Sequence, residues 1–535
     1  MKPILVPVIA VSIFGLLAMS AEAAEMPRKP QYYYTVPAAG PPQTIDADVC
    51  VYGATPAGII AAIQARRMGK AAVLVEFGRH LGGMTASGLS KTDGGKHAAG
   101  ISREFYKVVG DRDFSPAAAE AQFLHMLEAD EVRLFREHRL TAVAKDANRI
   151  TEIETENGNR FRARVFIDAT YEGDLLAKAG VSFTVGREAN SLYRETIDGI
   201  TAGSAAHNFR FPVDPYRTPC DAASGLLEGI SAAGPGTVGS GDRHVQAYNF
   251  RMYLSKGPNR IPFPKPQNYD PERYTLLARY IAAGAAIPDF MQLQEGDSNN
   301  QGGFSTDNIG ASDRWPEADY AERETIYQDH ISYQQGMMWF LTHDERVPEA
   351  IRRAVGAYGL SPTDFQETGG WPHQLYVREG RRMVADYVMT EHNCRGQIVA
   401  EDSIGLAEYN MDSHHCQRCL LMDKDAKTGE SRAIVRNEGD VQVHVPGPYP
   451  VAYRSIVPKQ AECSNLLVPV CLSASHIAYG SIRMEPVFMV LGQSAGTAAA
   501  LAIDADAPVQ QVDYAKLRAR LLADHQMLNV PAKKP

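Results

Sequence analysis

The stretch DADVCVYGATPAG at residues 46–58 decides the fold class of this chain. Polar and apolar residues alternate at its start, and the residues just before Gly53 are all apolar. This pattern predicts a buried strand that ends in a tight turn. Helical periodicity follows over residues 59–68, and a second apolar strand ends at Glu76. This order of strand, glycine-rich turn, helix, strand and acid predicts a Rossmann-like unit that binds a dinucleotide.

Each part of this unit has a physical role in holding a dinucleotide. Gly53 makes the sharp turn, and Gly58 lets the helix pack close to the strand. The N–H groups and dipole of the first helical turn can hold a pyrophosphate, and Glu76 can accept both ribose hydroxyls. Thr55 stands where the G-x-G-x-x-G pattern has its second glycine, so a purely structural turn is the alternative. The cofactor-binding candidates of this segment are Gly53, Thr55, Pro56, Ala57, Gly58 and Glu76.

Two further segments of the N-terminal region are expected to reach the same nucleotide. The sequence HLGGMT at 80–85 carries a glycine pair, which would let the backbone approach a cofactor closely. Residues 141–170 predict a β-meander around the Asn-Gly turn at 157–158, and its last strand ends in Asp-Ala-Thr. These segments add the cofactor-binding candidates Gly82, Gly83, Met84, Asp168, Ala169 and Thr170.

The third piece of the predicted nucleotide site lies near the other end of the chain. Residues 466–471 predict an apolar strand, and GQSAG at 492–496 is expected to open an alanine-rich helix that runs to 502. The start of such a helix could stabilise the negative charge of a reduced flavin, whereas simple packing of a helix on the sheet is the alternative. The candidates here are Gly492, Gln493, Ala495 and Gly496.

With these pieces together, the chain resembles the bacterial secreted FAD-dependent oxidoreductases of the glutathione-reductase-like superfamily. Some members of that family are named xanthan lyase, and the broader group includes heterodisulfide-reductase-like proteins. The matching motifs cover about 46–505, and the most specific is CLSASHIAYGSIRMEP at 471–486. The others are GATPAG at 53–58, HLGGMT at 80–85, FIDATYEGD at 166–174, YVREGRRM at 376–383, YNMDSH at 409–414, YRSIVPK at 453–459 and GQSAG at 492–496. The iron–sulfur cysteine motif of the heterodisulfide-reductase relatives is missing, so no cluster is expected.

The resemblance implies FAD as the cofactor and a FAD-binding domain that is divided in the sequence. We therefore expect an α/β fold, in which a Rossmann-like FAD-binding domain is built from both chain ends and carries an inserted α+β substrate domain. Helices are expected in the insertion around 317–345 and 377–392. The expected divisions are a signal peptide at 1–23, an extended lead-in at 24–44, the N-terminal part of the FAD-binding domain at 45–185, the inserted substrate or cap domain at 186–450, the C-terminal part of the FAD-binding domain at 451–510, and a C-terminal helix and tail at 511–535.

The first residues and the composition predict an exported chain that does not bind nucleic acid. An apolar run at 4–19 is followed by Ala21-Glu22-Ala23, a small-residue pattern that a signal peptidase cuts. An uncleaved anchor is the alternative, but the run is shorter than the roughly 20 residues that span a bilayer. The mature chain is expected in the periplasm or outside the cell, with no stable membrane span. The full sequence has 54 Lys and Arg against 63 Asp and Glu, a net charge of −9, and such an acidic balance does not favour binding of nucleic acid.

Seven cysteines in 535 residues are too few for a disulfide framework. Cys416 and Cys419 form a C-x-x-C pair that could be oxidised outside the cytoplasm. His414 and His415 precede this pair, which would make a metal site conceivable. No second Cys/His pair has the spacing of a zinc site, so no metal is expected.

Two histidines are candidates for a catalytic base. When a flavin oxidises an alcohol, a hydride leaves the substrate carbon and a protein base takes the hydroxyl proton, a role that suits histidine. The first candidate is His476, which the resemblance places beside the flavin ring. The second is His414, because Asp412 lies two residues before it on the same face of an extended segment and could orient the imidazole. The alternatives are a buried, satisfied histidine for His476 and a solvated loop histidine for His414.

Two arginines are candidates for binding substrate. Arg382 and Arg483 could bind a carboxylate or hydroxyl groups, whereas pairing with a nearby glutamate such as Glu379 or Glu485 is the alternative. Tyr376 is a further substrate-binding candidate, with packing as its alternative. The catalytic set is therefore His476, His414, Asp412 and Arg483, and the substrate-binding set is Tyr376 and Arg382.

The expected function is hydride transfer from a small polar organic substrate, for example a sugar or a sugar-derived alcohol, to the N5 atom of FAD. The sequence does not identify the electron acceptor. The alternatives are a flavoprotein that only passes electrons to a partner, a polysaccharide lyase, and a binding module that keeps a relic Rossmann core.

Overall fold

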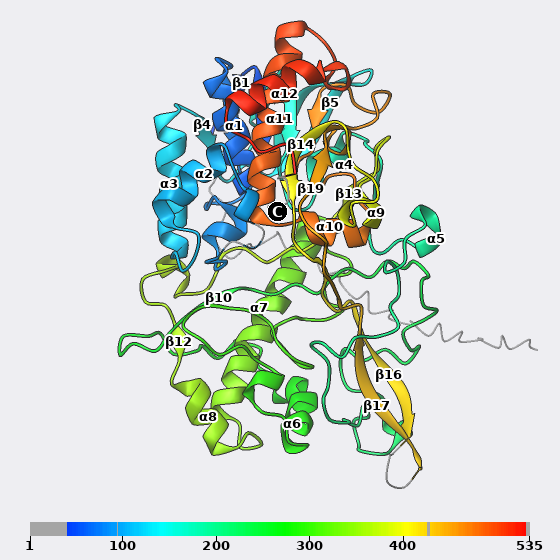
Figure 1. Ribbon diagram of the computed structural model, residues 1–535. Helices are drawn as coiled ribbons and strands as arrows, with labels where there is room; N and C mark the ends of the chain where they lie inside the picture. Colours follow the sequence, from blue (N-terminus) through cyan, green and yellow to red (C-terminus); the bar gives the residue numbers. More distant parts are fainter. Residues whose placement is uncertain (1–39, 92, 94, 425–428, 531–535) are drawn as a thin grey trace, which may run out of the picture.

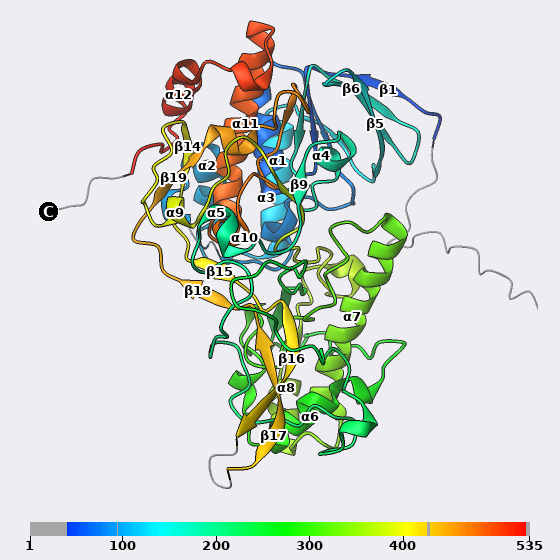
Figure 2. The ribbon, with the colours of Figure 1, turned by 90° about the vertical axis from the view of Figure 1, so that its right-hand side faces the viewer.

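The computed structural model describes residues 40–91, 93, 95–424 and 429–530. The predicted signal peptide at 1–23 and the lead-in up to residue 39 lie outside these residues. Figures 1 and 2 show two bodies. The upper body contains both ends of the chain, coloured blue and orange to red, and the lower body contains the middle of the chain, coloured green to yellow.

A parallel five-stranded sheet forms the centre of the upper body. Its strand order is β20-β8-β2-β3-β4, and every neighbouring pair is parallel. The strands are β2 Val49–Tyr52, β3 Ala72–Val75, β4 Arg133–Phe135, β8 Val165–Asp168 and β20 Leu466–Leu467. β2, β3 and β8 are buried along their whole length, which accounts for their apolar sequences. Because β20 pairs with β8, both chain ends complete one sheet, and the predicted α/β fold is confirmed.

Two helices from opposite ends of the chain pack against each other beside this sheet (Figure 1). They are α1 Pro56–Arg67 and α11 Glu485–Ala505. The contact is close because α11 presents glycines to α1. A Cβ atom on Gly492 would lie 2.1 Å from the carbonyl oxygen of Ala57, and one on Gly496 would lie 2.4 Å from that of Ala61. These two glycines are therefore required by helix packing.

The prediction that GQSAG at 492–496 opens a helix is wrong. α11 begins at Glu485, and Pro486 lies in its first turn, where proline is tolerated. The apolar residues just before Gly492 are therefore already part of α11. α11 is the only helix within the described residues that is long and apolar enough to cross a membrane, but 94% of its most apolar window is buried inside the fold.

A second, four-stranded sheet flanks the nucleotide unit in the order β1-β7-β6-β5. Its strands are β1 Thr44–Asp46, β5 Leu140–Asp146, β6 Arg149–Thr155 and β7 Arg160–Arg162. Gly158 in the turn between β6 and β7 has a positive φ of 81°, as expected for this turn. The meander predicted over 141–170 is thus confirmed, and β8 follows it.

The middle of the chain forms the lower body, but its elements α9, β9, β13, β14 and β19 lie in the upper body (Figures 1 and 2). The predicted helix around 317–345 is confirmed as α7, but 377–392 does not form a helix. That segment is irregular apart from a two-residue strand at Arg382–Met383 and a helix that begins at Glu391, and its Arg378, Arg381 and Arg382 pair with three different carboxylates. The helices are α5 Asn190–Tyr193, α6 Thr275–Ala282, α7 Tyr320–His343, α8 Glu349–Gly356 and α9 Glu391–Cys394. The strands are β9 Phe183–Thr184, β10 Met252–Ser255, β11 Gly296–Ser298, β12 Gly359–Leu360, β13 Arg382–Met383, β14 Ser403–Ala407, β15 Met411–Ser413, β16 Gln417–Lys424, β17 Ser431–Glu438, β18 Val441–Val443 and β19 Tyr449–Ala452.

Four remaining helices complete the upper body. They are α2 Ile101–Val109, α3 Pro116–Ala129, α4 Asp174–Lys178 and α12 Tyr514–Ala523. A further short helix, α10 His476–Ile482, directly precedes α11 and lies at the junction of the two bodies (Figure 1). The junction is thus bounded by the start of α11 from above and by loops of the lower body from below.

Candidate active site

The glycine-rich turn after β2 is built as the sequence predicts, with threonine in an unexpected role. Gly53 has a φ of +99°, and a Cβ atom there would lie 2.9 Å from the backbone of Ala169 and Thr170. Thr55 is the N-cap of α1, and its Oγ1 accepts a hydrogen bond from Gly58 N at 3.4 Å. The same hydroxyl donates to the carbonyl oxygen of Ala169 at 2.7 Å. Threonine therefore stands in place of the second glycine of the motif and links the turn to the end of β8 by a hydrogen bond.

Glu76 at the end of β3 lies directly against this turn. Its Oε2 accepts a hydrogen bond from Ala54 N at 2.5 Å, and its Oε1 accepts one from Gly78 N at 2.7 Å. Burial raises the pKa of Glu76 above its usual value, and these two backbone donors oppose that rise. The carboxylate is thus fixed beside the turn, at the place where the motif requires an acceptor.

A pocket, which we call the turn pocket, opens above the glycine-rich turn. One wall comes from the upper body and the other from loops and α7 of the lower body. Trp315 in the second wall has a buried indole N–H with no hydrogen-bond partner among the described residues. The pocket is lined by Tyr52, Gly53, Ala54, Thr55, Glu76, Phe77, Gly78, His80, Gly83, Thr170, Tyr171, Glu172, Asp174, Trp315, Arg323, Tyr327, His373, Gln374 and Leu375.

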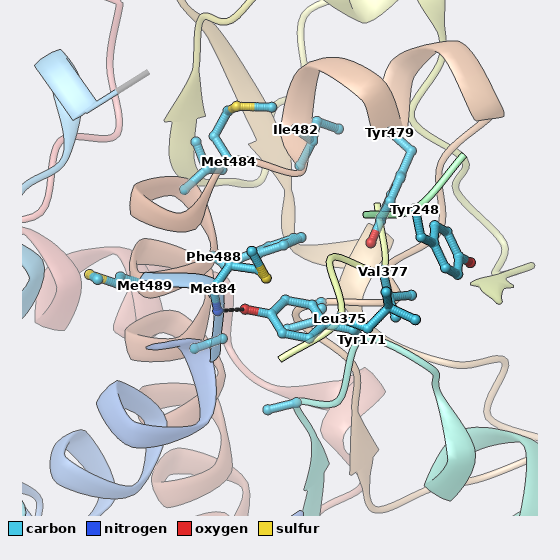
Figure 3. Close-up of a cluster of buried hydrophobic side chains, with 14 of the residues drawn as sticks. Met84, Tyr171, Tyr248, Leu375, Val377, Tyr479, Ile482, Met484, Phe488 and Met489 are labelled. Atoms are coloured by element: carbon cyan, nitrogen blue, oxygen red, sulfur yellow. Dashed lines mark hydrogen bonds between the residues drawn. The ribbon is translucent and has the colours of Figure 1, made fainter. Parts of the chain in front are cut away.

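A second pocket, which we call the polar pocket, lies at the start of α11. It is lined by Leu89, Asp93, Arg251, Asn299, Tyr376, Tyr409, Asp412, His414, Arg483, Met484, Glu485 and Pro486. Tyr171 connects the two pockets, since it lines the turn pocket and its hydroxyl donates to Glu485 Oε1 at 2.7 Å. Figure 3 shows the Tyr171 hydroxyl accepting a hydrogen bond from Met84 N, among apolar side chains of α10 and α11. The two pockets therefore adjoin each other.

His414 presents a neutral imidazole to the polar pocket. Its Nδ1 lies 2.8 Å from Asp307 Oδ2, and its Nε2 lies 3.7 Å from Asp412 Oδ2. Burial and the nearby guanidinium of Arg378 lower the pKa of His414 to about 4. Although burial alone would raise the pKa of Asp307, Arg378 and His414 lower it to about 2. At neutral pH an ionised Asp307 thus accepts the Nδ1 proton, which leaves Nε2 as the basic nitrogen.

Arg483 at the end of α10 is held by two groups of the polar pocket. Its Nη2 donates to Asp412 Oδ2 at 2.8 Å, and its Nη1 donates to the hydroxyl of Tyr376 at 3.1 Å. Its Nε–H is buried and has no partner among the described residues. Asp412, Arg483 and Tyr376 therefore form one hydrogen-bonded group beside His414, where the sequence predicted substrate-contacting residues.

A family model described as FAD dependent oxidoreductase matches residues 48–521 of this chain. The chain belongs to the FAD-dependent oxidoreductase family. It is therefore an oxidoreductase that uses FAD. This identification agrees with the divided parallel sheet and with the two adjoining pockets.

The solved structures that resemble this FAD-dependent oxidoreductase are remote. They include the anhydrotetracycline hydroxylase OxyS from Streptomyces rimosus (14% identity, TM-score 0.24, 27% of this chain and 36% of that chain). They also include a flavin-containing monooxygenase from Stenotrophomonas maltophilia (17%, 0.20, 28% and 43%) and L-proline dehydrogenase from P. horikoshii (19%, 0.19, 28% and 26%). The chain spans less than half of the length of each. Among curated proteins, none matches this chain.

The residues of the turn pocket fit FAD. Gly53, Ala54 and Thr55 line the pocket at the start of α1, where a pyrophosphate would be held, whereas Pro56, Ala57 and Gly58 are buried in the first turn of the helix and do not line it. Glu76 provides an acceptor for ribose hydroxyls, and Trp315 provides an unused donor. These residues would hold the nucleotide part of FAD in this oxidoreductase.

Several other cofactor-binding candidates shape the protein around the turn pocket. Thr170 and Gly83 line the pocket. Asp168 instead accepts hydrogen bonds from Thr170 N at 3.1 Å and Leu176 N at 2.8 Å, so it fixes the turn after β8, together with the packed Ala169. Gly82 has no room for a side chain because the ring of Phe123 lies there. These glycines and Asp168 are explained by contacts within the protein.

The four candidates on α11 lie in the interior of that helix and line neither pocket. Gly492 and Gly496 contact α1, and Ala495 is fully buried. Gln493 Oε1 accepts a hydrogen bond from Ile101 N at 2.9 Å, so it caps the start of α2. The residues of α11 that reach a pocket are those of its first turn, because the helix begins seven residues earlier than expected, at Glu485.

His476 and Arg382 also lie outside both pockets, contrary to the expectation that they contact substrate. His476 is 1% exposed, and its ring nitrogens lie 2.7 Å from Glu379 Oε2 and 3.0 Å from Ser413 Oγ. Arg382 is fully buried, and its Nη1 and Nε lie 2.7 Å from Glu188 Oε1 and 2.8 Å from Glu379 Oε1. Both side chains therefore belong to a buried ion network with Glu188 and Glu379.

Sequence reasoning missed three residues of the site. Asp307 lies in a loop of the lower body and belongs to none of the sequence motifs. Only the structure shows that it contacts His414. Tyr171 belongs to the motif at 166–174, which assigns it no role, and the sequence suggests Glu485 only as a partner for an arginine. Burial raises the pKa of Glu485 to about 8, so its carboxyl is mostly neutral at pH 7.

The C-x-x-C pair takes no part in either pocket. Cys416 and Cys419 are free, buried thiols, and Cys419 Sγ contacts Gln417 Oε1 at 3.4 Å. Within the described parts of the chain, no group of three or more His, Cys, Asp or Glu side chains is arranged to hold a metal ion.

The Glu76→Ala variant is expected to lose FAD more readily than the wild type. Hydrogen bonds to a charged group contribute about 1.5–3 kcal/mol, so we expect FAD affinity to fall about 10- to 100-fold. The affinity can be measured by flavin fluorescence during titration of the apoprotein with FAD. Glu76→Gln, which keeps one acceptor oxygen, is the matched control and should lose less. Full flavin retention by Glu76→Ala after dialysis would contradict the assigned role.

Proposed function

We propose that this protein is an exported FAD-dependent oxidoreductase that removes a hydride from a small polar substrate, for example a sugar or a sugar-derived alcohol, in the polar pocket. The observation that carries the proposal is the His414–Asp307 pair at 2.8 Å, placed in a pocket that adjoins the FAD site through Tyr171 and Glu485. The proposed export rests on the apolar run at 4–19 and the cleavage pattern Ala21-Glu22-Ala23. The electron acceptor is an unidentified partner.

His414 is the proposed general base. A substrate hydroxyl donates a hydrogen bond to Nε2, while Asp307 holds the Nδ1 proton and so keeps the reactive nitrogen unprotonated. FAD, when bound, accepts the hydride that leaves the substrate carbon. The hydroxyl proton moves to His414 at the same time, and the C–O single bond becomes a carbonyl. The resulting imidazolium is stabilised by Asp307 on one side and by Asp412 on the other.

Arg483 and Tyr376 are proposed to position the substrate. Arg483 is fixed by Asp412 and by the hydroxyl of Tyr376, so its remaining Nε–H has a defined direction. A donor that is fixed before substrate binds costs little entropy when the hydrogen bond forms. Burial of the pocket at the start of α11 would also keep water away from the reacting carbon.

Anaerobic mixing of the holoprotein with a panel of sugars and polyols tests this function. Bleaching of the flavin absorbance by at least one neutral alcohol, with formation of the matching carbonyl product, is the expected result. Reduction by an artificial electron donor alone, with no response to any alcohol, would favour an electron-transfer protein. Release of an unsaturated, ultraviolet-absorbing product from a polysaccharide without any flavin change would favour a lyase.

The rate of flavin reduction is expected to fall at low pH as His414 becomes protonated. The pKa of His414 lies at about 4, and only the unprotonated form above that value can accept the substrate proton. The rate should therefore be constant from about pH 6 down to about pH 5 and then fall nearly tenfold per pH unit below about pH 4. Rapid mixing from pH 7 into acid, followed within milliseconds, separates this loss from acid unfolding. A fall centred near pH 6.5 would contradict the environment described for His414.

A further inference from the structure

We propose that the polar pocket selects an electrically neutral, polyhydroxylated substrate over its carboxylate counterpart, and that Asp412 is the residue that sets this specificity. The inference rests on the proposed function and deepens it. It comes from the pairing of charges in the pocket, which contains two guanidinium groups, Arg251 and Arg483, and two carboxylates, Asp93 and Asp412.

Neither guanidinium is open to a substrate carboxylate. Arg251 donates through Nε to Asp297 Oδ1 at 2.8 Å and through Nη2 to the other oxygen of the same carboxylate. Asp297 is 3% exposed, so this bidentate ion pair is shielded from solvent. Arg483 donates through Nη2 to Asp412 at 2.8 Å. A carboxylate is bound best by two parallel hydrogen bonds from a free guanidinium group. Neither arginine can offer this bidentate arrangement, because each is already paired with a carboxylate.

No other unpaired positive charge faces the pocket within the described residues. Arg378, which lies behind His414, is paired with Asp307 at 3.0 Å. His414 itself is neutral above about pH 4, because burial and Arg378 lower its pKa. An entering carboxylate would therefore meet Asp93 and Asp412 without a compensating cation, and burial of an unpaired charge is strongly unfavourable.

The pocket offers hydrogen-bonding groups that suit hydroxyls. A hydroxyl can accept from one group and donate to another, and Arg483 provides an unused Nε–H next to the carboxylate of Asp412. A second hydroxyl can donate to His414 Nε2, while Asn299 and Tyr409 line the remaining wall.

Two probes that share one ring and differ in charge test the selectivity: D-glucose and D-glucuronate. Their binding to the oxidised holoprotein is measured at pH 7 by the perturbation of the flavin absorbance, so that no turnover is needed. If glucose itself reduces the flavin, the same titration is made in the His414→Asn holoprotein. We expect glucose to bind at least about tenfold more tightly than glucuronate.

The Asp412→Asn variant identifies the residue responsible. The substitution removes a negative charge and weakens the hydrogen bond that Arg483 Nη2 donates. The affinity for glucuronate relative to glucose should therefore rise at least about tenfold. Asp423→Asn is the matched control, because Asp423 lies on β16 in a partly exposed pair with Arg432 and removes the same charge far from the pocket. This control should leave the ratio unchanged.

The proposal is overturned if wild-type protein binds glucuronate as tightly as glucose, if neither probe gives a saturable response, or if Asp412→Asn leaves the ratio unchanged. These outcomes are distinct from failure of hydride transfer, because binding is recorded without turnover. Selective binding of glucose in a protein whose flavin no alcohol reduces would refute the proposed function and leave the selectivity intact.

Discussion

The His414→Ala variant is expected to retain FAD but to be reduced by substrate about 10²–10⁴-fold more slowly than the wild type. The variant loses the only imidazole nitrogen that lines the polar pocket within the described residues, and no neighbouring group combines a neutral state with a free basic nitrogen. Asp412 cannot take over that role, because it already accepts a hydrogen bond from Arg483. The rate is measured by anaerobic stopped-flow recording of the flavin absorbance.

His476→Gln is the matched control for that experiment. His476 is buried and both of its ring nitrogens are bonded within the protein, so the variant should keep the reduction rate of its folded fraction within a few-fold of the wild type. Asp307→Asn should lie between the two, because an amide no longer selects the tautomer with an unprotonated Nε2. Loss of reduction in His476→Gln together with normal reduction in His414→Ala would exchange the two roles.

The Glu379→Ala variant is expected to lower the free energy of unfolding by about 3–5 kcal/mol. Glu379 is fully buried and accepts a hydrogen bond from Gln246 Nε2 at 2.7 Å, besides its contacts with His476 and Arg382. Although burial alone would raise the pKa of Glu379, His476 and Arg382 lower it to about 2, so the group is ionised. Its removal leaves the buried guanidinium of Arg382 with one counter-ion fewer.

The loss can be measured by urea denaturation of the holoprotein, followed by tryptophan and flavin fluorescence. Glu317→Ala is the control, because Glu317 forms an exposed pair with Arg243 that should contribute only about 0–1 kcal/mol. If Glu379→Ala costs no more than Glu317→Ala, the network around Arg382 does not stabilise the fold.

The nucleotide unit could be predicted from the sequence because its constraints are local. The strand, the turn at Gly53, the cap of α1 and the acid at Glu76 follow each other within about thirty residues. Each element carries its own pattern, either uniform apolarity for a buried strand or a glycine where a Cβ atom has no room. The resemblance of the C-terminal motifs then indicated that β20 joins the same sheet.

The start of α11 could not be predicted in the same way. Glycines are typical both of a backbone that approaches a cofactor and of two helices in close contact, and the sequence pattern alone does not separate the two. The structure shows the second case for Gly492 and Gly496, since both contact the backbone of α1. The helix start at Glu485 carries no capping side chain, which removes the usual signal for a first turn.

The choice between the two histidines also depended on contacts that the sequence does not contain. His476 and His414 both follow a serine in the sequence, and only His414 has an acid nearby, Asp412, so the local sequence does not identify the carboxylate that each imidazole contacts. His476 finds its carboxylate in Glu379 and His414 finds its own in Asp307, each from a segment far away in the chain. Only the second pair borders a pocket, which is why we assign the base to His414.

The pairing of β20 with β8 has a consequence for biosynthesis. Phe166 lies opposite Leu466, so the nascent chain must reach its last stretch before the central sheet can close. Such distant partners give a high contact order, which slows folding. The emerging polypeptide must therefore wait, with its first half exposed, until the ribosome has nearly finished, and capture of the flavin should be among the final events of maturation.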